Sequence, residues 1–159
     1  AQWFCREILP KLRVRIPATE FWIVGAAPTP AVQSLSQQPG VHVTGRVPDV
    51  RPYLRHAAVV AAPLRIARGV QNKILEAMAM GGAVVTTPAA AEGVDGALVG
   101  HELEASWDPD TFADAIAALV QQPAARAAMG ERARARVLRE YDWDTNLARL
   151  DRLLFEVAA

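Results

Sequence analysis

Short apolar segments that alternate with helical segments constrain the fold of this chain more than any other feature. The apolar segments are four to six residues long and most end at a glycine or a proline. Such runs are typical of strands buried in a parallel sheet. The predicted strands are residues 20–25, 41–44, 57–62 and 83–87, with a weaker strand at 97–99.

Apolar residues recur at helical spacing between these strands and beyond the last one. Pro10 predicts a kink in the first helix, because proline removes one helical hydrogen bond. Gly81 and Gly82 predict the end of a helix, and Asp108 is a candidate cap for a later one. The predicted helices are residues 3–14, 30–38, 50–56, 70–80, 110–122, 124–140 and 144–157.

This alternation predicts an α/β fold, with a doubly wound, Rossmann-like and mostly parallel sheet. We expect one domain over residues 1–159, with the sheet core at about 1–107 and C-terminal helices at about 108–159. Ligands of such folds bind beyond the carboxyl ends of the strands. The loops after Val24, Thr44, Ala62 and Thr87 are therefore the candidate site.

Composition narrows the class of partner. The chain has 159 residues, is 52% hydrophobic and carries no net charge, so no overall field favours nucleic acid. A single cysteine and the lack of a run of about 20 apolar residues favour a cytoplasmic location, with attachment to the inner face of a membrane left open. The three histidines lack ligand spacing, so we expect no metal, and we expect Trp22, Trp107 and Trp143 to pack in the core or between helices.

The segment from Arg68 to Glu76 carries the most specific chemistry. At about 100° per residue, Asn72, Lys73 and Glu76 share one helix face, and Ile74, Leu75 and Met78 lie opposite. Gly69 precedes the first turn, whose free N–H groups favour an anion such as a phosphate. Glu76 could accept hydrogen bonds from a ribose diol. An ordinary surface pair of Glu76 with Lys73 or Asn72 explains the spacing equally well.

Residues 69–85 (GVQNKILEAMAMGGAVV) and 45–54 (GRVPDVRPYL) resemble the C-terminal domain of retaining GT-B glycosyltransferases of the group 1, or family 4, type. The likeness runs from Trp3 to about Leu154 and is similar to the bacterial branch associated with exopolysaccharide assembly. It implies binding of a UDP- or GDP-sugar and retaining transfer to a saccharide or a lipid-linked acceptor, with no metal or other cofactor. It also implies an N-terminal acceptor domain as partner, without which the chain would be inactive.

The resemblance assigns roles to single residues. Glu76 matches the final glutamate of the family's E-x7-E motif, which holds the ribose. Arg68 stands where the first glutamate is expected, which leaves the sugar contact open; it faces either the diphosphate or solvent. Lys73 and Arg68 would stabilise the leaving diphosphate. The predicted donor contacts are Gly45, Arg46, Val47, Gly69, Val70, Gln71, Asn72, Lys73, Glu76, Glu92 and Gly93.

Three points stay open at this stage. Arg46 could be only a surface residue and Glu92 only a turn residue. The family's first, central strand would precede this chain, so the sheet lacks it; the gap closes, another chain fills it, or the fold is marginal. A non-catalytic doubly wound module and a GT-B nucleotide-sugar epimerase remain alternatives. A dinucleotide oxidoreductase is disfavoured, because residues 25–28 lack the G-x-G-x-x-G turn.

Overall fold

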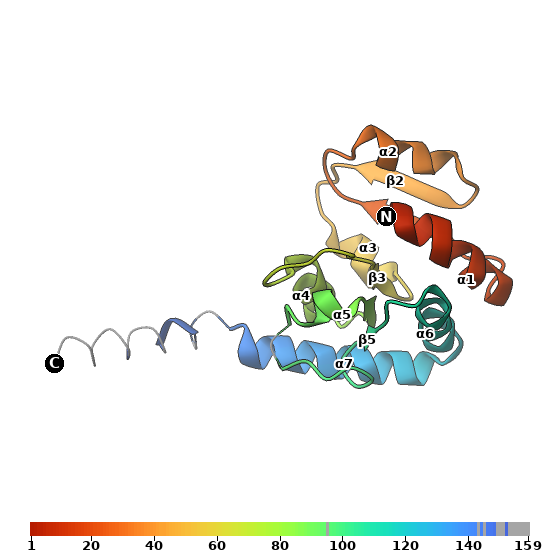
Figure 1. The fold of residues 1–159 in the computed structure, drawn as a ribbon. Helices are drawn as coiled ribbons and strands as arrows, with labels where there is room; N and C mark the ends of the chain where they lie inside the picture. The colour runs from red at the N-terminus through yellow and green to blue at the C-terminus, as the bar shows by residue number, and fades with distance from the viewer. Residues whose placement is uncertain (95, 143, 145, 149–151, 153–159) are drawn as a thin grey trace.

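The computed structural model describes all residues except 95, 143, 145, 149–151 and 153–159 (Figure 1). The first half of the chain forms η1 (Phe4–Ile8), α1 (Leu9–Arg15), β1 (Phe21–Val24), α2 (Pro30–Gln33), η2 (Ser34–Gln37), β2 (Val41–Gly45) and α3 (Arg51–His56). The second half forms β3 (Val60–Ala62), α4 (Asn72–Ala79), β4 (Val84–Thr86), α5 (Pro88–Ala91), β5 (Glu104–Ala105), α6 (Pro109–Gln121) and α7 (Pro123–Glu140). The predicted helix at 144–157 falls largely outside the described residues.

All of these strands pair in parallel, which confirms the predicted α/β class. They form two separate sheets, one with the order β1-β2 and one with the order β3-β4-β5. Within each sheet the strands keep a simple register, for example Phe21 beside Val41 and Val60 beside Val84. The predicted gap in the sheet therefore remains open in this structure.

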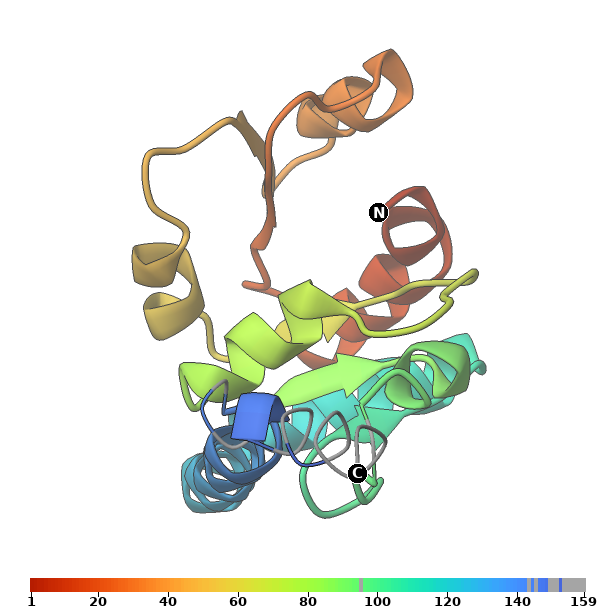
Figure 2. The same cartoon turned by 90° about the vertical axis from the view of Figure 1, so that its left-hand side faces the viewer.

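A cavity of about 700 Å³ lies between the two sheets, and we call it the β1–β3 groove. All residues of β1 and of β3 line it, together with apolar side chains from the helices on either side. Figure 2 shows α1 and α3 on opposite sides of this space. The groove thus separates a small unit containing β1 and β2 from a larger unit containing β3, β4 and β5.

The first helix crosses between these two units. It begins as the π-helix η1 and continues as α1, with Pro10 near the junction. A π-turn relieves the conflict that a proline creates in a helix, in agreement with the predicted kink. The Phe4 ring stacks on Phe21 of β1 with centroids 4.3 Å apart and meets Phe112 of α6 edge-on at 6.1 Å.

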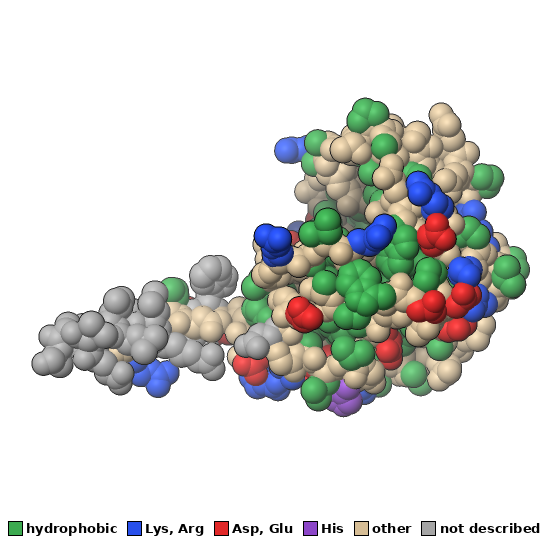
Figure 3. All heavy atoms as spheres, in the orientation of Figure 1, with side chains coloured by type: hydrophobic (Ala, Val, Ile, Leu, Met, Phe, Trp, Pro, Cys, Tyr) green, Lys and Arg blue, Asp and Glu red, His purple; other side chains and the backbone are tan. Residues whose placement is uncertain are grey.

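Ion pairs on the surface reinforce this crossing. Lys11 lies 2.6 Å from Asp110, and Arg15 lies 2.5 Å from Asp114, so both pairs join α1 to α6. Figure 3 shows basic and acidic side chains side by side over these two helices. Exposed pairs of this kind each contribute at most about 1 kcal/mol, so the buried rings are the main link.

Several local predictions were wrong. Residues 97–99 form no strand, since Val99 makes only an isolated bridge to Leu103, and the third strand of the sheet is Glu104–Ala105 instead. The short helix α5 was not predicted. Trp22 and Trp107 are about half exposed, at 49% and 46%, and are not core anchors. Trp22 stacks on His42 beside the β1–β3 groove, and Trp143 lies outside the described residues.

None of the helices in the described part of the chain has the length and apolar character needed to cross a bilayer.

A buried ion pair fixes α7 to the loop before β5. Arg136 Nε lies 2.6 Å from Glu102 Oε2, and the same oxygen accepts the Leu98 N–H at 2.9 Å. Burial alone would raise the pKa of Glu102, but the Leu98 N–H and the Arg136 guanidinium hold it below its ordinary value. The carboxylate therefore stabilises the fold only while it is charged.

We predict that Glu102→Gln lowers the free energy of unfolding by about 1.5–3 kcal/mol at neutral pH. Because the folded pKa is lowered, the contribution of Glu102 is complete above its unfolded pKa of about 4.3. It is lost as the pH falls through the lower folded pKa. Urea unfolding at several pH values should show the two proteins converging only in acid.

The exposed Glu131 on α7 provides the control, since Glu131→Gln should change the unfolding free energy by less than about 0.5 kcal/mol. A difference between the original chain and Glu102→Gln that persists at the lowest pH would contradict the assignment.

Candidate functional site

The helix α4 and the loop that leads into it form the centre of the site. α4 begins at Asn72, two residues later than predicted, because Gln71 adopts a non-helical conformation with φ −104° and ψ 89°. The Gln71 side-chain amide donates to the backbone oxygens of Arg68 and Gly69, at 3.2 and 3.1 Å. These bonds close the loop into a tight turn directly ahead of the helix.

Gly69 gives this loop its shape. Its φ of +62° is a left-handed conformation that favours glycine, and no atom lies within 4 Å of the position of a side-chain β-carbon. A ligand can therefore approach the backbone closely at Gly69, as the sequence predicted.

The two faces of α4 differ as the helical spacing predicted. Ile74, Ala77 and Met78 are fully buried and hold the helix on the three-stranded sheet. Asn72, Lys73 and Glu76 are exposed. Both Lys73 and Glu76 line the edge of the β1–β3 groove. The three polar side chains are thus fixed by the packing of the opposite face.

The structure decides between the two explanations of this polar face. Within the described part of the chain, Glu76 forms no ion pair with Lys73 and no hydrogen bond with Asn72. A helix-surface pair therefore does not account for Glu76. Its carboxylate is available as an acceptor, and the Lys73 ammonium is available for an anion.

Contacts from the neighbouring strand and loop hold the segment 63–71 in place, and sequence reasoning missed them. The Thr87 hydroxyl donates to Leu64 O at 2.5 Å, and the Thr86 hydroxyl donates to Ala62 O at 2.8 Å. Both threonines are fully buried at the end of β4. Two hydroxyls inside an otherwise apolar strand were the signal available in the sequence, because buried hydroxyls need partners.

Gly93 fixes the other end of the same segment. A β-carbon at Gly93 would lie 2.3 Å from the Gly69 oxygen, so the two backbones are in direct contact. The structure therefore brings together two predicted site residues that are far apart in the sequence. Glu92, beside Gly93, is exposed at the end of α5 and has no side-chain partner among the described residues.

The charge around the segment favours an anion. Ile74 and Leu75 N–H both donate to Gln71 O, at 2.8 and 3.2 Å, which leaves the earlier N–H groups of the first turn directed outwards. Arg65, Arg68 and Lys73 are exposed, and none has a charge partner in the described chain. Burial, together with the nearby Lys73 charge, lowers the pKa of the Ala1 amine.

The remaining predicted contacts lie in the other sheet. Gly45 ends β2, and Arg46 and Val47 follow it, so this loop is separated from Gly69 by β1 and the groove. Arg46 is exposed and has no partner among the described residues. No group of three His, Cys, Asp or Glu side chains in the described chain is placed to hold a metal ion. The arrangement is thus suited to a phosphate next to a hydroxylated group.

Comparison with solved structures identifies the same architecture. HepE from Anabaena, crystallised with UDP, has a TM-score of 0.76 and 18% identity, over 98% of this chain and 46% of its own. TarM has a TM-score of 0.74 and 19% identity, over 91% and 31%. Sucrose-phosphate synthase from Thermosynechococcus elongatus has a TM-score of 0.70 and 22% identity, over 96% and 43%. At these identities the likeness establishes the fold alone.

The chain spans less than half the length of each of these proteins. No curated protein matches it in sequence. A family model does match, over residues 1–122, and its description is glycosyl transferases group 1. Since the match covers well over half of the sequence, the chain belongs to the group 1 family of glycosyl transferases.

Proposed function

We propose that this chain is the donor-binding domain of a glycosyltransferase that uses a nucleoside-diphosphate sugar. One observation carries the proposal: Glu76 is exposed and unpaired one turn beyond a glycine loop and helix N-terminus that are suited to phosphate. An acceptor for a ribose diol and a phosphate site therefore lie on the same short helix. The crystallisation of HepE with UDP and with UDP-glucose supports this class of ligand.

In this proposal each part of the site contacts one part of the donor. Glu76 accepts hydrogen bonds from the ribose hydroxyls, and Lys73 and the N–H groups at residues 69–72 contact the diphosphate. The loop at Gly45, Arg46 and Val47 holds the base through its backbone. Glu92 and Gly93 lie on the diphosphate or sugar side.

Catalysis would consist mainly of stabilising the leaving diphosphate. Lys73, Arg68 and the positive end of α4 supply that charge without a metal. Transfer would retain the anomeric configuration. A saccharide or a lipid-linked acceptor would bind to a second, N-terminal domain, and this chain alone would be inactive. Cell-surface or exopolysaccharide synthesis in the bacterial cytoplasm fits the sequence likeness.

Replacement of Glu76 tests the ribose contact. We predict that the chain binds UDP or GDP with a micromolar to millimolar Kd, and that Glu76→Gln weakens binding by about 1.5–3 kcal/mol, or roughly 10- to 150-fold. The loss should be much smaller for a ligand without the ribose diol, such as the 2′,3′-dideoxynucleotide. Isothermal titration calorimetry measures both.

The matched control is Glu131→Gln, an exposed glutamate of α7, which should leave the affinity unchanged. If no nucleotide binds to the original chain, or if Glu76→Gln binds as tightly as the original, the ribose role is wrong. A non-catalytic interaction module would then be the better explanation.

Replacement of the two cations tests the diphosphate contact. We predict that Lys73→Gln weakens UDP binding by about tenfold while uridine binding changes little, because a charge-assisted hydrogen bond to phosphate is lost. Arg68→Gln should have the same selectivity if Arg68 faces the diphosphate. Equal losses for UDP and uridine would instead indicate a general disturbance of the loop.

Gly93 tests whether the position of the Gly69 loop matters for binding. Gly93→Ala places a β-carbon against the Gly69 oxygen and forces the loop to move, so UDP affinity should fall by about tenfold and stability by about 1–3 kcal/mol. Gly100→Ala is the control. It strains a residue at φ +79° but has no neighbour within 4 Å, so it should lower stability by about 1 kcal/mol and leave the affinity intact.

A further inference from the structure

The β1–β3 groove has a backbone edge on each side. β1 pairs with β2 through one edge, and β3 pairs with β4 through one edge, so the other edge of each strand faces the groove. Exposed strand edges present unpaired N–H and C=O groups to any further strand. Parallel strands are usually covered on both sides, and here the exposed Trp22 shows that β1 is not.

Printed hydrogen bonds identify which backbone groups point into the groove. Phe21 N–H donates to Gly40 O at 2.8 Å on the β2 side, and Val60 N–H donates to Ala83 O at 2.9 Å on the β4 side. Backbone groups of successive residues in a strand point to opposite edges. The N–H and C=O groups of Trp22 and Ala61 therefore face the groove.

The direction of the two edges is the same. β1 and β2 are parallel, and β2 connects to β3 through residues 46–59, which include the helix α3. A helical crossover of this length joins parallel strands. The two edges are thus compatible with one strand between them, parallel to both, which would give the continuous order β2-β1-strand-β3-β4-β5.

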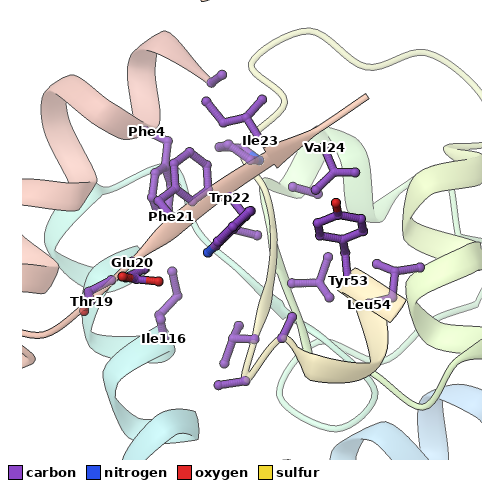
Figure 4. Close-up of a pocket in the computed structure, with 18 of the residues that line it drawn as sticks. Phe4, Thr19, Glu20, Phe21, Trp22, Ile23, Val24, Tyr53, Leu54 and Ile116 are labelled. Carbon is purple, nitrogen blue, oxygen red and sulfur yellow. The ribbon is translucent and has the colours of Figure 1, made fainter. Parts of the chain in front are cut away.

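The walls of the groove set the chemistry of that strand. Phe4, Leu12 and Ile116 line the side of α1 and α6, and Tyr53 and Leu54 line the side of α3. Figure 4 shows the stacked Phe4 and Phe21 rings on one side and Tyr53 and Leu54 on the other, with Trp22 between them. Side chains on both faces of an inserted strand would therefore meet apolar surface.

We propose that the β1–β3 groove is a docking site for one extended, apolar polypeptide strand that runs parallel to β1 and β3. Its backbone pairs with Trp22 on one side and with Ala61 on the other. Its carboxyl end lies at the rim where Ala1, Lys73 and Glu76 line the cavity. The proposal concerns strand pairing alone and stands whether or not the chain binds a nucleotide.

Amide hydrogen exchange tests the pairing directly. The probe is a synthetic peptide of about five consecutive Val and Ile residues flanked by lysines. We expect saturating peptide to slow exchange at the Trp22 and Ala61 amides by about tenfold or more. The amides of Phe21 and Val60 already pair within their sheets and should change little. The same peptide with a central proline, which cannot donate at that position, should protect neither Trp22 nor Ala61.

A second arm removes the dependence on peptide affinity. The same strand joined to Ala1 through a turn of about three residues raises its effective concentration to the millimolar range. The fused strand should protect the same two amides and raise the midpoint of thermal unfolding. Ala61→Pro removes the N–H that faces the groove but not the Val60 bond to Ala83, so it should reduce the protection of Trp22 in both arms.

Two results would overturn the proposal. One is the absence of protection at Trp22 and Ala61 with both the peptide and the fused strand. The other is protection of these amides that rises with protein concentration in the absence of peptide, which would assign the groove to a second copy of the chain.

Discussion

The packing of Phe4 between Phe21 and Phe112 is the interaction on which the relative placement of the two sheets depends. The sheets share no strand pairing, so side chains must hold them in place. Phe4 is 2% exposed and Phe112 is fully buried, and both belong to one apolar cluster that reaches from β2 to α6. Burial of such rings contributes more than the exposed ion pairs between α1 and α6, so the halves are joined by an apolar hinge.

This arrangement divides the candidate site into parts of unequal rigidity. The Gly69 loop, Lys73 and Glu76 all rest on the three-stranded sheet, where Thr87, Gly93 and Ile74 fix the backbone from three directions. The loop at Gly45 belongs to the other sheet. In the proposed function, the phosphate and ribose contacts are therefore preorganised within one unit. The base contact depends on the Phe4 junction and on whatever fills the β1–β3 groove.

Local patterns in the sequence predicted the parts of the fold that local physics decides. The helical spacing placed Ile74 and Met78 inside and Lys73 and Glu76 outside, because burial of one helix face follows from periodicity. Features that depend on distant partners were missed. β5 has only two residues and pairs with a strand 18 residues earlier, and Trp22 is exposed because a neighbouring strand position is empty. Spacing alone could not decide whether Glu76 pairs with Lys73, since rotamers settle that choice.

Arg68 shows how far the site departs from the pattern that the family likeness implies. Its loop is closed by Gln71 and carries two further exposed cations, Arg65 and Lys73, without charge partners in the described chain. A glutamate at this position would repel a diphosphate and accept bonds from sugar hydroxyls, whereas an arginine attracts the diphosphate and can only donate. The substitution therefore moves binding energy from the sugar to the diphosphate. A site of this kind would hold UDP and UDP-sugar with similar strength, and its choice of sugar would depend on residues outside the Gly69 loop.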